Sequence, residues 1–514
     1  MIYFVNTNIG ANKSGIEHAE LKRMQLFEQH HTPAKIVTTE WHTDCHQITA
    51  DAGLSDSQLL NLFDFYQKRL ETSEQFTYFK DLDFGVDQVI TREDSGKNRL
   101  LVQRPDGRLV ARVNYNPKQE KCITSVELFD GYGNLYAVDN YDSRGFKSEI
   151  DWYSPDNQID RKEWLTSSGQ VVIRQFFNLN RSKKLVSTAW WLKDRHGKQF
   201  TFNTWAEVLT KFYNDLNEKG NNVFVLDRAL SSDEEMLHLK RPAYLAYHMH
   251  NSQGADSHDE MHSVLNNNYE YGLNNIDRYS AVISATPNQT EDLKKRFKPQ
   301  RAKLFTIPVG IVPDSQLNAK KIPESKRTFG KVIIAARISS EKQIPKIVNS
   351  IALVHKQVPE VTLDIWGYTN STAERDAIKQ AAKKGNIEDA VHLKGYSENI
   401  GQVYDDAQIF VLASSMEGFN LAIMEATSHG DVGVTYDTNY GPNSIIQNGQ
   451  NGYVVPYNDE QSMADKIIKL LKDQDLLQKM SDQAYQLSNR YSSASVWRQW
   501  QALLDDAKVY FGED

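Results

Sequence analysis

The fold of this chain is decided by one stretch, Glu417-Gly-Phe-Asn-Leu-Ala-Ile-Met-Glu425, which places two carboxylates eight residues apart. The apolar run before it, residues 408–413, predicts a buried strand, and residues 421–429 predict a helix. The backbone N–H groups of residues 419–421 then lie at or near a helix N-terminus, which with the helix dipole suits a phosphate. A carboxylate one to two turns further along can accept hydrogen bonds from ribose hydroxyls. The alternative is a capped helix with two ordinary surface glutamates.

A second motif lies about 75 residues upstream of Glu417. Residues 331–336 predict a strand, and the loop after it carries two cations five positions apart, Arg337 and Lys342. These two side chains suit a diphosphate, because arginine binds phosphate oxygens as a planar fork and lysine as a point charge. Two solvated surface cations are the alternative for such a pair considered alone.

The order of these elements along the chain resembles the donor-site motifs of family 4 GT-B glycosyltransferases, which are retaining nucleotide-sugar enzymes. The elements are the strand, the Arg/Lys loop, a helix and the Glu-x7-Glu stretch. The resemblance covers nearly the whole chain. It implies an α/β fold of the GT-B type, with two Rossmann-like domains facing a cleft and a β-meander inserted in the N-terminal domain. An N-terminal half interrupted by such a meander resembles two groups within this family. One group is the poly(glycerol- or ribitol-phosphate) α-glycosyltransferases of wall teichoic acid, and the other is the glycosyltransferases of serine-rich repeat adhesins.

Length and composition set wider limits. The 514 residues are enough for two or three domains, and 40% hydrophobic with 25% charged residues is typical of a globular protein. A net charge of −8 gives no indication of nucleic-acid binding. Two cysteines cannot form a disulfide framework. We find no signal-peptide pattern and no apolar run long enough for a membrane span, so we expect a cytoplasmic protein.

The chain starts with a predicted strand at residues 2–6, a loop containing Ser14 and Gly15, and a helix. A glycine there permits close approach of the backbone to a ligand, although a structural tight turn is nearly as good an explanation. The family resemblance implies that this loop approaches the donor phosphates and the acceptor. The family often has two adjacent glycines at this place, so Ser14 is a mild departure. A second strand is expected at 34–39 and a helix near 56–72.

Residues 86–203 have a different character from the rest. Short β-type runs alternate with turn signals such as Pro105-Asp-Gly107, Gly133-Asn134, Ser143-Arg-Gly145 and Ser168-Gly169, which predicts a meander of successive hairpins. Aromatic residues are dense here. They can form one face of a sheet packed on itself, or a surface for acceptor binding or self-association. We favour self-association, so a homo-oligomer is expected.

Residues 204–315 return to an α/β pattern and complete the N-terminal domain begun by 1–85. His250 follows a predicted strand, where ligands bind in open parallel sheets; His248 is a rival on the same face, and a satisfied core histidine is as good an explanation for either. A polar segment, 314–328, is the expected linker. Alternating strands and helices at 329–490 predict a second Rossmann-like domain for the nucleotide-sugar, and the resemblance implies that the helix in 491–514 crosses back to the first domain.

The resemblance implies transfer from a UDP-sugar carrying glucose or N-acetylglucosamine to a glycoprotein or teichoic acid. In that reaction Arg337 and Lys342 neutralise charge on the leaving UDP, Glu425 holds the ribose, Glu417 contacts the sugar hydroxyls, and His250 contacts the 6-hydroxyl or the acceptor. No cofactor or metal is expected, because cations already offset the diphosphate charge. The other expected donor-binding residues are Ser14, Gly15, Gly367, Tyr396, Gly418, Phe419, Asn420 and Leu421.

Two other functions remain open. One is an inactive subunit that only binds the acceptor, and the other is a GT-B sugar synthase or phosphorylase with a small acceptor. The presence of Arg337, Lys342, Glu417 and Glu425 together favours an active enzyme. A meander of more than 100 residues is unnecessary for a small acceptor. The sequence leaves open the hexose, the acceptor and its linkage, the oligomer number, and the choice between His248 and His250.

Overall fold

The protein is described by a computed structural model that covers all residues except 12, 70–74, 370, 398 and 514. The described residues form two compact units. The first unit consists of Met1–Glu17 and Thr32–Ala243, and the second of His18–His31 and Tyr244–Asp514. No helix in these described parts combines the length and the apolar character needed to span a bilayer.

The first unit contains a short parallel sheet made from apolar runs. Strand β1 (Ile2–Val5) pairs with β14 (Asn222–Leu226) on one side and with β2 (Ala34–Thr38) on the other, and β3 (Leu59–Asn61) pairs with β2. The helix predicted near 56–72 is confirmed only for Leu62–Gln67, because β3 lies within that range, and residues 70–72 are outside the described residues. A three-residue run is too short for its periodicity to distinguish strand from helix. The helices that begin in this unit are α1 (Gly15–Gln29), α2 (Cys45–Asp51), α3 (Leu62–Gln67), α4 (Trp205–Leu216) and α5 (Asp233–Met236).

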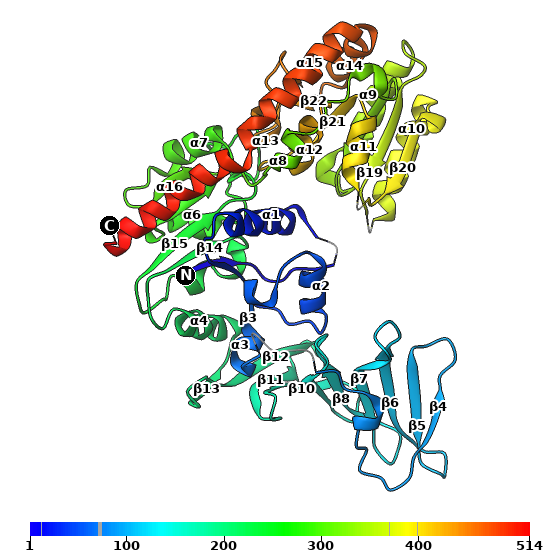
Figure 1. The fold of residues 1–514 in the computed structure, drawn as a ribbon, viewed down its shortest axis with the longest axis vertical. Helices are drawn as coiled ribbons and strands as arrows, with labels where there is room; N and C mark the ends of the chain where they lie inside the picture. The colour runs from blue at the N-terminus through cyan, green and yellow to red at the C-terminus, as the bar shows by residue number, and fades with distance from the viewer. Residues whose placement is uncertain (12, 70–74, 370, 398, 514) are drawn as a thin grey trace. The chain divides into compact units, whose positions relative to one another are not determined.

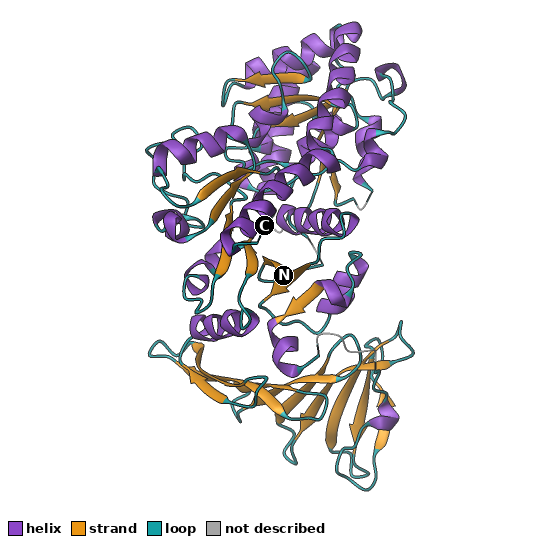
Figure 2. Ribbon diagram, turned by 60° about the vertical axis from the view of Figure 1, so that its left-hand side comes forward, coloured by secondary structure: helices purple, strands orange, loops and turns teal. Residues whose placement is uncertain are grey.

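The predicted meander is confirmed. Ten antiparallel strands follow one another, each paired with the next along the chain, and form one twisted sheet (Figures 1 and 2). The strands are β4 (Ile90–Glu93), β5 (Arg99–Gln103), β6 (Leu109–Asn116), β7 (Cys122–Phe129), β8 (Leu135–Tyr141), β9 (Lys147–Tyr153), β10 (Ile159–Leu165), β11 (Val171–Leu179), β12 (Leu185–Lys193) and β13 (Gln199–Phe202).

The turns of the meander repeat with a fixed chemistry. Left-handed residues recur every 12 positions at Gly133, Gly145, Asn157 and Gly169, each with a positive φ. In each of these turns the residue three positions earlier accepts a hydrogen bond from the left-handed residue, and the strand register shifts beside the turn. This is a type I turn closed by a bulge, which needs a left-handed residue and therefore favours glycine or asparagine.

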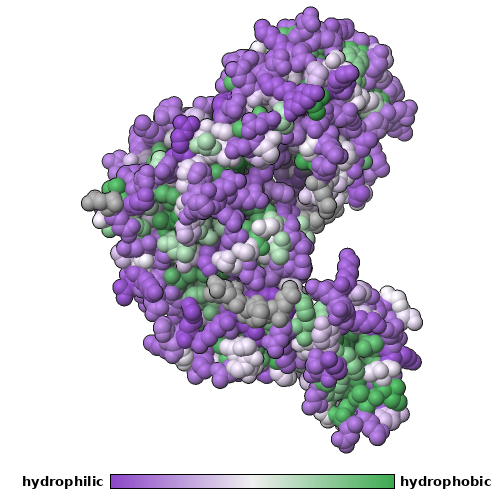
Figure 3. Space-filling model, viewed as in Figure 1, coloured by the Kyte–Doolittle hydropathy of each residue, from purple (hydrophilic) through white to green (hydrophobic). Residues whose placement is uncertain are grey.

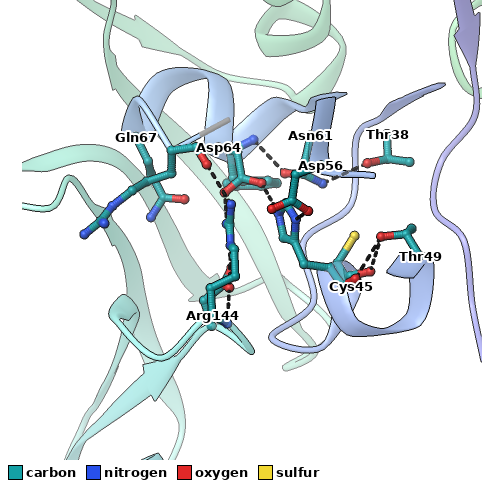
Figure 4. A network of polar contacts seen from close by, with 12 residues as sticks. Thr38, Cys45, Thr49, Asp56, Asn61, Asp64, Gln67 and Arg144 are labelled. Carbon is teal, nitrogen blue, oxygen red and sulfur yellow. Dashed lines mark hydrogen bonds and ion pairs between the residues drawn. The ribbon is translucent and has the colours of Figure 1, made fainter. Parts of the chain in front are cut away.

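A buried polar network joins the meander to the α/β part of the same unit (Figure 4). Arg144, in the turn between β8 and β9, donates from Nη2 to Asp64 Oδ1 and to Asp142 Oδ2, both at 2.9 Å. His46 Nε2 lies 2.6 Å from Asp64 Oδ2, and its Nδ1 lies 2.7 Å from Asp56 Oδ1. Burial lowers the pKa of His46, but the hydrogen bond and the charge of Asp64 outweigh burial and raise it. The network therefore fixes the meander by charge-assisted hydrogen bonds.

The second unit contains two parallel sheets. A three-stranded group is formed by β15 (Ala243–His248), β16 (Ala281–Ser284) and β17 (Lys303–Thr306). The six-stranded sheet has the order β20-β19-β18-β21-β22-β23 and confirms the predicted alternation of strands and helices. Its strands are β18 (Lys331–Ala335), β19 (Thr362–Trp366), β20 (Val391–Gly395), β21 (Ile409–Leu412), β22 (Val432–Tyr436) and β23 (Gly452–Val455).

Helices cover the six-stranded sheet and complete one large apolar core (Figure 1). The polar segment expected as a linker contributes to this packing. The Arg327 side chain is fully buried and donates to Asp431 Oδ1 at 2.9 Å and to the Ala407 carbonyl. The helices of this part are α8 (Asp314–Leu317), α9 (Ile344–His355), α10 (Thr372–Gly385), α11 (Ile400–Asp406), α12 (Leu421–Ser428), α13 (Gly441–Ile445), α14 (Glu460–Lys472), α15 (Gln474–Leu487) and α16 (Ser493–Phe511).

The C-terminal helix α16 packs on the other elements of the second unit. Tyr244 in β15 donates to Asp506 Oδ2 at 2.6 Å. The Trp500 ring meets the Phe27 ring of α1 edge-on, with centroids 5.5 Å apart. These contacts attach residues 18–31 of α1 to the same compact body as α16. The remaining helices of the unit are α6 (Glu270–Asn274) and α7 (Pro287–Phe297).

Candidate active site

The order in which strands are added to the six-stranded sheet reverses between β18 and β21. These two strands are neighbours in space although β19 and β20 lie between them in sequence. In open parallel sheets this switch point is where ligands bind, at the carboxyl ends of the strands. The loop after β18 carries Arg337 and Lys342, and the loop after β21 carries Glu417. The topology therefore brings both predicted motifs to one end of the sheet.

The two motifs are in direct contact. Lys342 Nζ lies 2.7 Å from Glu417 Oε1, and both side chains are largely buried, with 16% and 9% exposed. Asn420 Nδ2 donates to the same carboxylate oxygen at 2.8 Å. One carboxylate oxygen thus accepts from two donors, which holds the carboxylate and the ammonium in fixed positions.

Asn420 also begins the helix that follows. Its backbone is left-handed, with φ 74°, and its side-chain oxygen accepts from the Ile423 N–H at 3.0 Å, as an N-cap does. The N-terminus of α12 lies at the end of the sheet that carries the Lys342–Glu417 pair. The other N–H groups of its first turn and the positive end of the helix dipole are therefore at this end. This arrangement is suited to an anion such as a phosphate.

Arg337 is more accessible than Lys342. Its Nη2 lies 2.7 Å from Glu341 Oε1, and 61% of its side chain is exposed. Burial raises the pKa of Glu341, but hydrogen bonds from Ser339 and Arg337 outweigh burial and lower it. The Glu341 carbonyl also accepts from the Ser415 N–H at 2.8 Å, so the Arg/Lys loop is tied to the loop that carries Glu417.

Glu425 lies in the second turn of α12, where it is paired with a lysine of α1. Lys22 Nζ lies 2.6 Å from Glu425 Oε1, with 27% and 28% of the two side chains exposed. Glu425 therefore keeps access to solvent, which a ribose-binding carboxylate needs. Lys22 is not among the predicted site residues, because nothing local in a sequence links two residues 403 positions apart.

Close backbone contacts make glycine necessary at two positions of the site. A Cβ at Gly418 would lie 2.2 Å from the carbonyl oxygen of His250 and 2.7 Å from the Cα of Asn251. A Cβ at Gly367 would lie 1.9 Å from the carbonyl oxygen of Ala336, next to Arg337, and Gly367 has a φ of 136°. These contacts set the loops after β21 and β19 at distances that no other residue type allows.

His250 lies two residues beyond the end of β15, and Gly418 brings its backbone against the loop of Glu417. The rings of His248 and His250 are 4.2 Å apart, so they share a face, as strand alternation predicted. His248 is fully buried and its Nδ1 lies 3.3 Å from Arg23 Nη1, whereas His250 is half-buried. The backbone contact and the greater access both favour His250 as the site histidine.

A buried network, which the sequence analysis missed, connects the strand β15 side to the Glu417 loop. The Tyr440 N–H donates to the Glu417 carbonyl at 2.8 Å, and its hydroxyl donates to Asp292 Oδ2 at 3.0 Å. Gln253 Nε2 donates to the Tyr440 hydroxyl, and Ser257 Oγ donates to the Ser415 carbonyl at 2.6 Å. The polar loop after His250 could have pointed to such contacts, but not to their partners.

The remaining predicted donor residues differ in their surroundings. Phe419 is buried and its ring meets Tyr491 edge-on, so it belongs to the core rather than to an open surface. Leu421, the first residue of α12, is half-buried. Tyr396, after β20, is 56% exposed and thus available to a ligand.

Ser14 and Gly15 belong to the first unit. Gly15 begins α1, and a Cβ there would meet no atom within 4 Å. The Ser14 N–H donates to Glu17 Oε2 at 2.5 Å, and Arg228 Nη2 donates to Glu17 Oε1 at 2.7 Å. Burial raises the pKa of Glu17, but hydrogen bonds from Ser14 and Arg228 outweigh it and lower the pKa. A carboxylate therefore uses a backbone N–H group of the loop that the family resemblance places near the donor phosphates.

Known proteins are similar to this chain over nearly its whole length. Residues 315–487 match the family model "Glycosyl transferases group 1", and residues 104–182 match the "GtfB middle domain". The chain is 25% identical to the "UDP-N-acetylglucosamine--peptide N-acetylglucosaminyltransferase GtfA subunit" of Streptococcus pneumoniae, covering 98% of this chain and 99% of the relative. It is also 25% identical to the "Poly(glycerol-phosphate) alpha-glucosyltransferase" of Bacillus subtilis, covering 97% of this chain and 74% of the relative.

The structure of the pneumococcal O-GlcNAc transferase GtfA in complex with UDP and GlcNAc is similar to this chain, with a TM-score of 0.81 and 98% coverage of both chains. The fold is thus the α/β GT-B fold, as the sequence predicted.

Proposed function

We propose that the chain is a glycosyltransferase that moves glucose or N-acetylglucosamine from a UDP-sugar to an acceptor of the bacterial cell surface, with retention of the anomeric configuration. The observation that carries the proposal is the contact of Lys342, Glu417 and Asn420 at the switch point of the sheet, beside the N-terminus of α12. The similarity to a UDP-N-acetylglucosamine transferase over nearly the whole chain supports it.

In the proposed reaction the bond between the sugar and the β-phosphate breaks, and negative charge develops on UDP. Lys342, Arg337 and the first turn of α12 stabilise this charge, which is usually the largest contribution to catalysis. The cations supply the positive charge that a metal ion supplies in other nucleotide-sugar enzymes. A reaction without metal or cofactor therefore remains our prediction.

The remaining groups orient the donor. Glu417, held by Lys342 and Asn420, accepts hydrogen bonds from sugar hydroxyls near the reacting carbon. Glu425 accepts from the ribose hydroxyls. His250 contacts the 6-hydroxyl of the sugar or the acceptor, because Gly418 holds its backbone against the Glu417 loop.

The first experiment measures hydrolysis of a panel of UDP-glucose, UDP-N-acetylglucosamine and other nucleotide-sugars by the purified protein. We expect turnover of one UDP-sugar. Lys342→Met should lower that turnover by about 100-fold or more, because it removes charge stabilisation in the transition state. Lys356→Met, at an exposed lysine beyond α9, is the matched control. No turnover of any donor, with or without acceptor, would contradict the proposal and favour an inactive acceptor-binding subunit.

The acceptor is proposed to be either a serine-rich glycoprotein or a teichoic acid, since one relative acts on peptide and another on poly(glycerol-phosphate) by their names. Transfer to a serine-rich peptide, to poly(glycerol phosphate) and to a free sugar distinguishes them. Transfer to the free sugar alone would favour the sugar-synthase alternative. The anomeric configuration of the product, measured by NMR, tests retention.

We further propose that the chain self-associates through the meander. Strand β4 is the edge of the ten-stranded sheet, and all four of its residues are exposed. Ile90 is 54% exposed, and Figure 3 shows apolar side chains gathered on the visible face of the meander. An exposed edge with apolar side chains is able to pair with another chain.

Light scattering tests this association. Ile90→Lys should lower the mass of the assembly, and Leu179→Lys, at another exposed apolar position of the meander, is the control. An unchanged mass in Ile90→Lys, or a monomeric wild-type protein, would exclude self-association through β4.

A further inference from the structure

The candidate site contains a charged group that its motifs do not include. Lys22 in α1 places its ammonium 2.6 Å from Glu425 Oε1 in α12. Residues 18–31 of α1 and all of α12 belong to the same compact unit. The contact is therefore internal to one body of the protein.

The helix that carries Lys22 is firmly packed. Leu21, Met24 and Leu26 are buried, and the Phe27 ring meets Trp497 edge-on with centroids 5.3 Å apart. A lysine on a helix that is fixed in this way has a restricted range, so its ammonium is held near Glu425. A fully exposed ion pair between mobile side chains would contribute little, but here both partners are half-buried, with 27% and 28% of their side chains exposed.

The pair leaves Glu425 able to bind a ligand. A carboxylate has two oxygens and about four acceptor positions. Lys22 uses Oε1, so Oε2 can point toward the two hydroxyls of a ribose. A neighbouring ammonium that fixes the rotation of the carboxylate reduces the freedom lost when ribose binds.

We propose that Lys22 is a positioning residue of the donor site, which orients the Glu425 carboxylate for the 2′- and 3′-hydroxyls of the ribose of the nucleotide. The inference rests on the proposed function, because it takes a ribonucleotide as the ligand. It adds α1 to the elements that recognise the donor and assigns Lys22 to selection of ribose rather than to the diphosphate.

The test compares binding of UDP with binding of 2′,3′-dideoxy-UDP, which lacks both hydroxyls, by titration calorimetry. The wild-type protein should bind UDP more tightly by about tenfold or more, because two hydrogen bonds to a charged group are lost in the dideoxy compound. Lys22→Met should reduce this preference to about twofold to threefold, mainly by weakening UDP. Lys22→Arg, which keeps a cation, should recover most of the preference.

Two further variants separate positioning from folding. Gln25→Met changes an exposed residue of the same helix and should keep the full preference. Glu425→Gln should lose the preference even with Lys22 present. Equal weakening of both nucleotides in Lys22→Met, or an unchanged preference, would overturn the assignment of Lys22. A wild-type protein that binds neither nucleotide would contradict the proposed function itself.

Discussion

Gly418→Ala should damage the site strongly while changing only one methyl group. The Cβ at this position would lie 2.2 Å from the carbonyl oxygen of His250. A carbon and a carbonyl oxygen in contact are about 3.3 Å apart, so the two backbones must separate by about 1 Å. The three atoms nearest to the new Cβ all belong to the backbone of His250 and Asn251, so rotation of a side chain cannot relieve the contact.

The consequence for activity follows from that displacement. Glu417 is adjacent to Gly418, and His250 is the residue that must move, so the distance between two proposed substrate contacts changes. A misplacement of about 1 Å can cost about 100-fold in rate, and overpacking of this kind costs about 1–3 kcal/mol of stability. We therefore expect kcat/KM for UDP-sugar hydrolysis to fall by about 100-fold in a protein that still folds.

The control is Gly131→Ala in the turn between β7 and β8. A Cβ there meets no atom within 4 Å, and its φ lies outside the left-handed region. This variant should match the wild-type protein in activity and melting temperature. If Gly418→Ala is folded by circular dichroism and keeps kcat/KM within about twofold of the wild-type value, the Gly418–His250 contact does not set the geometry of the site.

Three other changes test separate parts of the structure. Burial raises the pKa of Glu260 to about 7, above the ordinary 4.5. The protonated carboxyl of Glu260 therefore contributes stability that is complete below about pH 4.5 and is lost as the pH rises through 7. Glu260→Gln should remove this pH-dependent loss of the free energy of unfolding, which is at most about 3 kcal/mol. Urea unfolding at pH 5 and pH 8 measures the loss in both proteins, and an equal pH dependence in the two would contradict the burial argument. Arg144→Met removes the cation that pairs with the buried carboxylates of Asp64 and Asp142, and should cost about 3–5 kcal/mol in urea unfolding although His46 still contacts Asp64. Arg108→Met, at an exposed pair, should have little effect; similar costs would show that the network of Arg144 is not stabilising. Tyr440→Phe should lower kcat with little change in KM for the UDP-sugar. The variant loses the hydrogen bond from the hydroxyl to Asp292 but keeps the N–H that donates to the Glu417 carbonyl. Steady-state kinetics measures both constants, and a change in KM alone would refute this prediction.

The parts of the fold that could be predicted depend on short stretches of sequence. Most strands of the six-stranded sheet are apolar runs flanked by polar or turn residues, with β20 as an exception because it includes His392 and Lys394. The order of motifs along the chain placed Arg337, Lys342 and Glu417 after two of the apolar strands. The meander turns were predictable for the same reason, since a type I turn with a bulge needs a left-handed residue. The 12-residue recurrence from Gly133 to Gly169 is present in the sequence but is not a plain glycine repeat, because Asn157 replaces glycine at one of the four positions.

The N-cap role of Asn420 was also available, since an asparagine directly before a predicted helix is a typical N-cap. Its second role, donating a hydrogen bond to Glu417, could not be predicted from the sequence, because it depends on the left-handed backbone at that position. The contact of Gly418 with His250 was equally out of reach. A glycine in a loop indicates backbone freedom or a close approach, and only the structure distinguishes the two.

The pairing of charges marks the limit of prediction from sequence most clearly. Arg144 lies in a stretch that the sequence identified as a hairpin turn, Ser143-Arg-Gly145, and turn residues are expected to be exposed. The backbone follows that prediction, with Gly145 at a φ of 99°, but the Arg144 side chain is buried between Asp64 and Asp142. The turn conformation is set by neighbouring residues, whereas burial is set by Asp64, 80 positions away. Lys22 and Glu425 follow the same rule, because each is an ordinary polar residue of an amphipathic helix until the fold brings the two helices together. Variants of Arg144 and Lys22 are therefore the most direct tests of what the three-dimensional structure adds to the sequence.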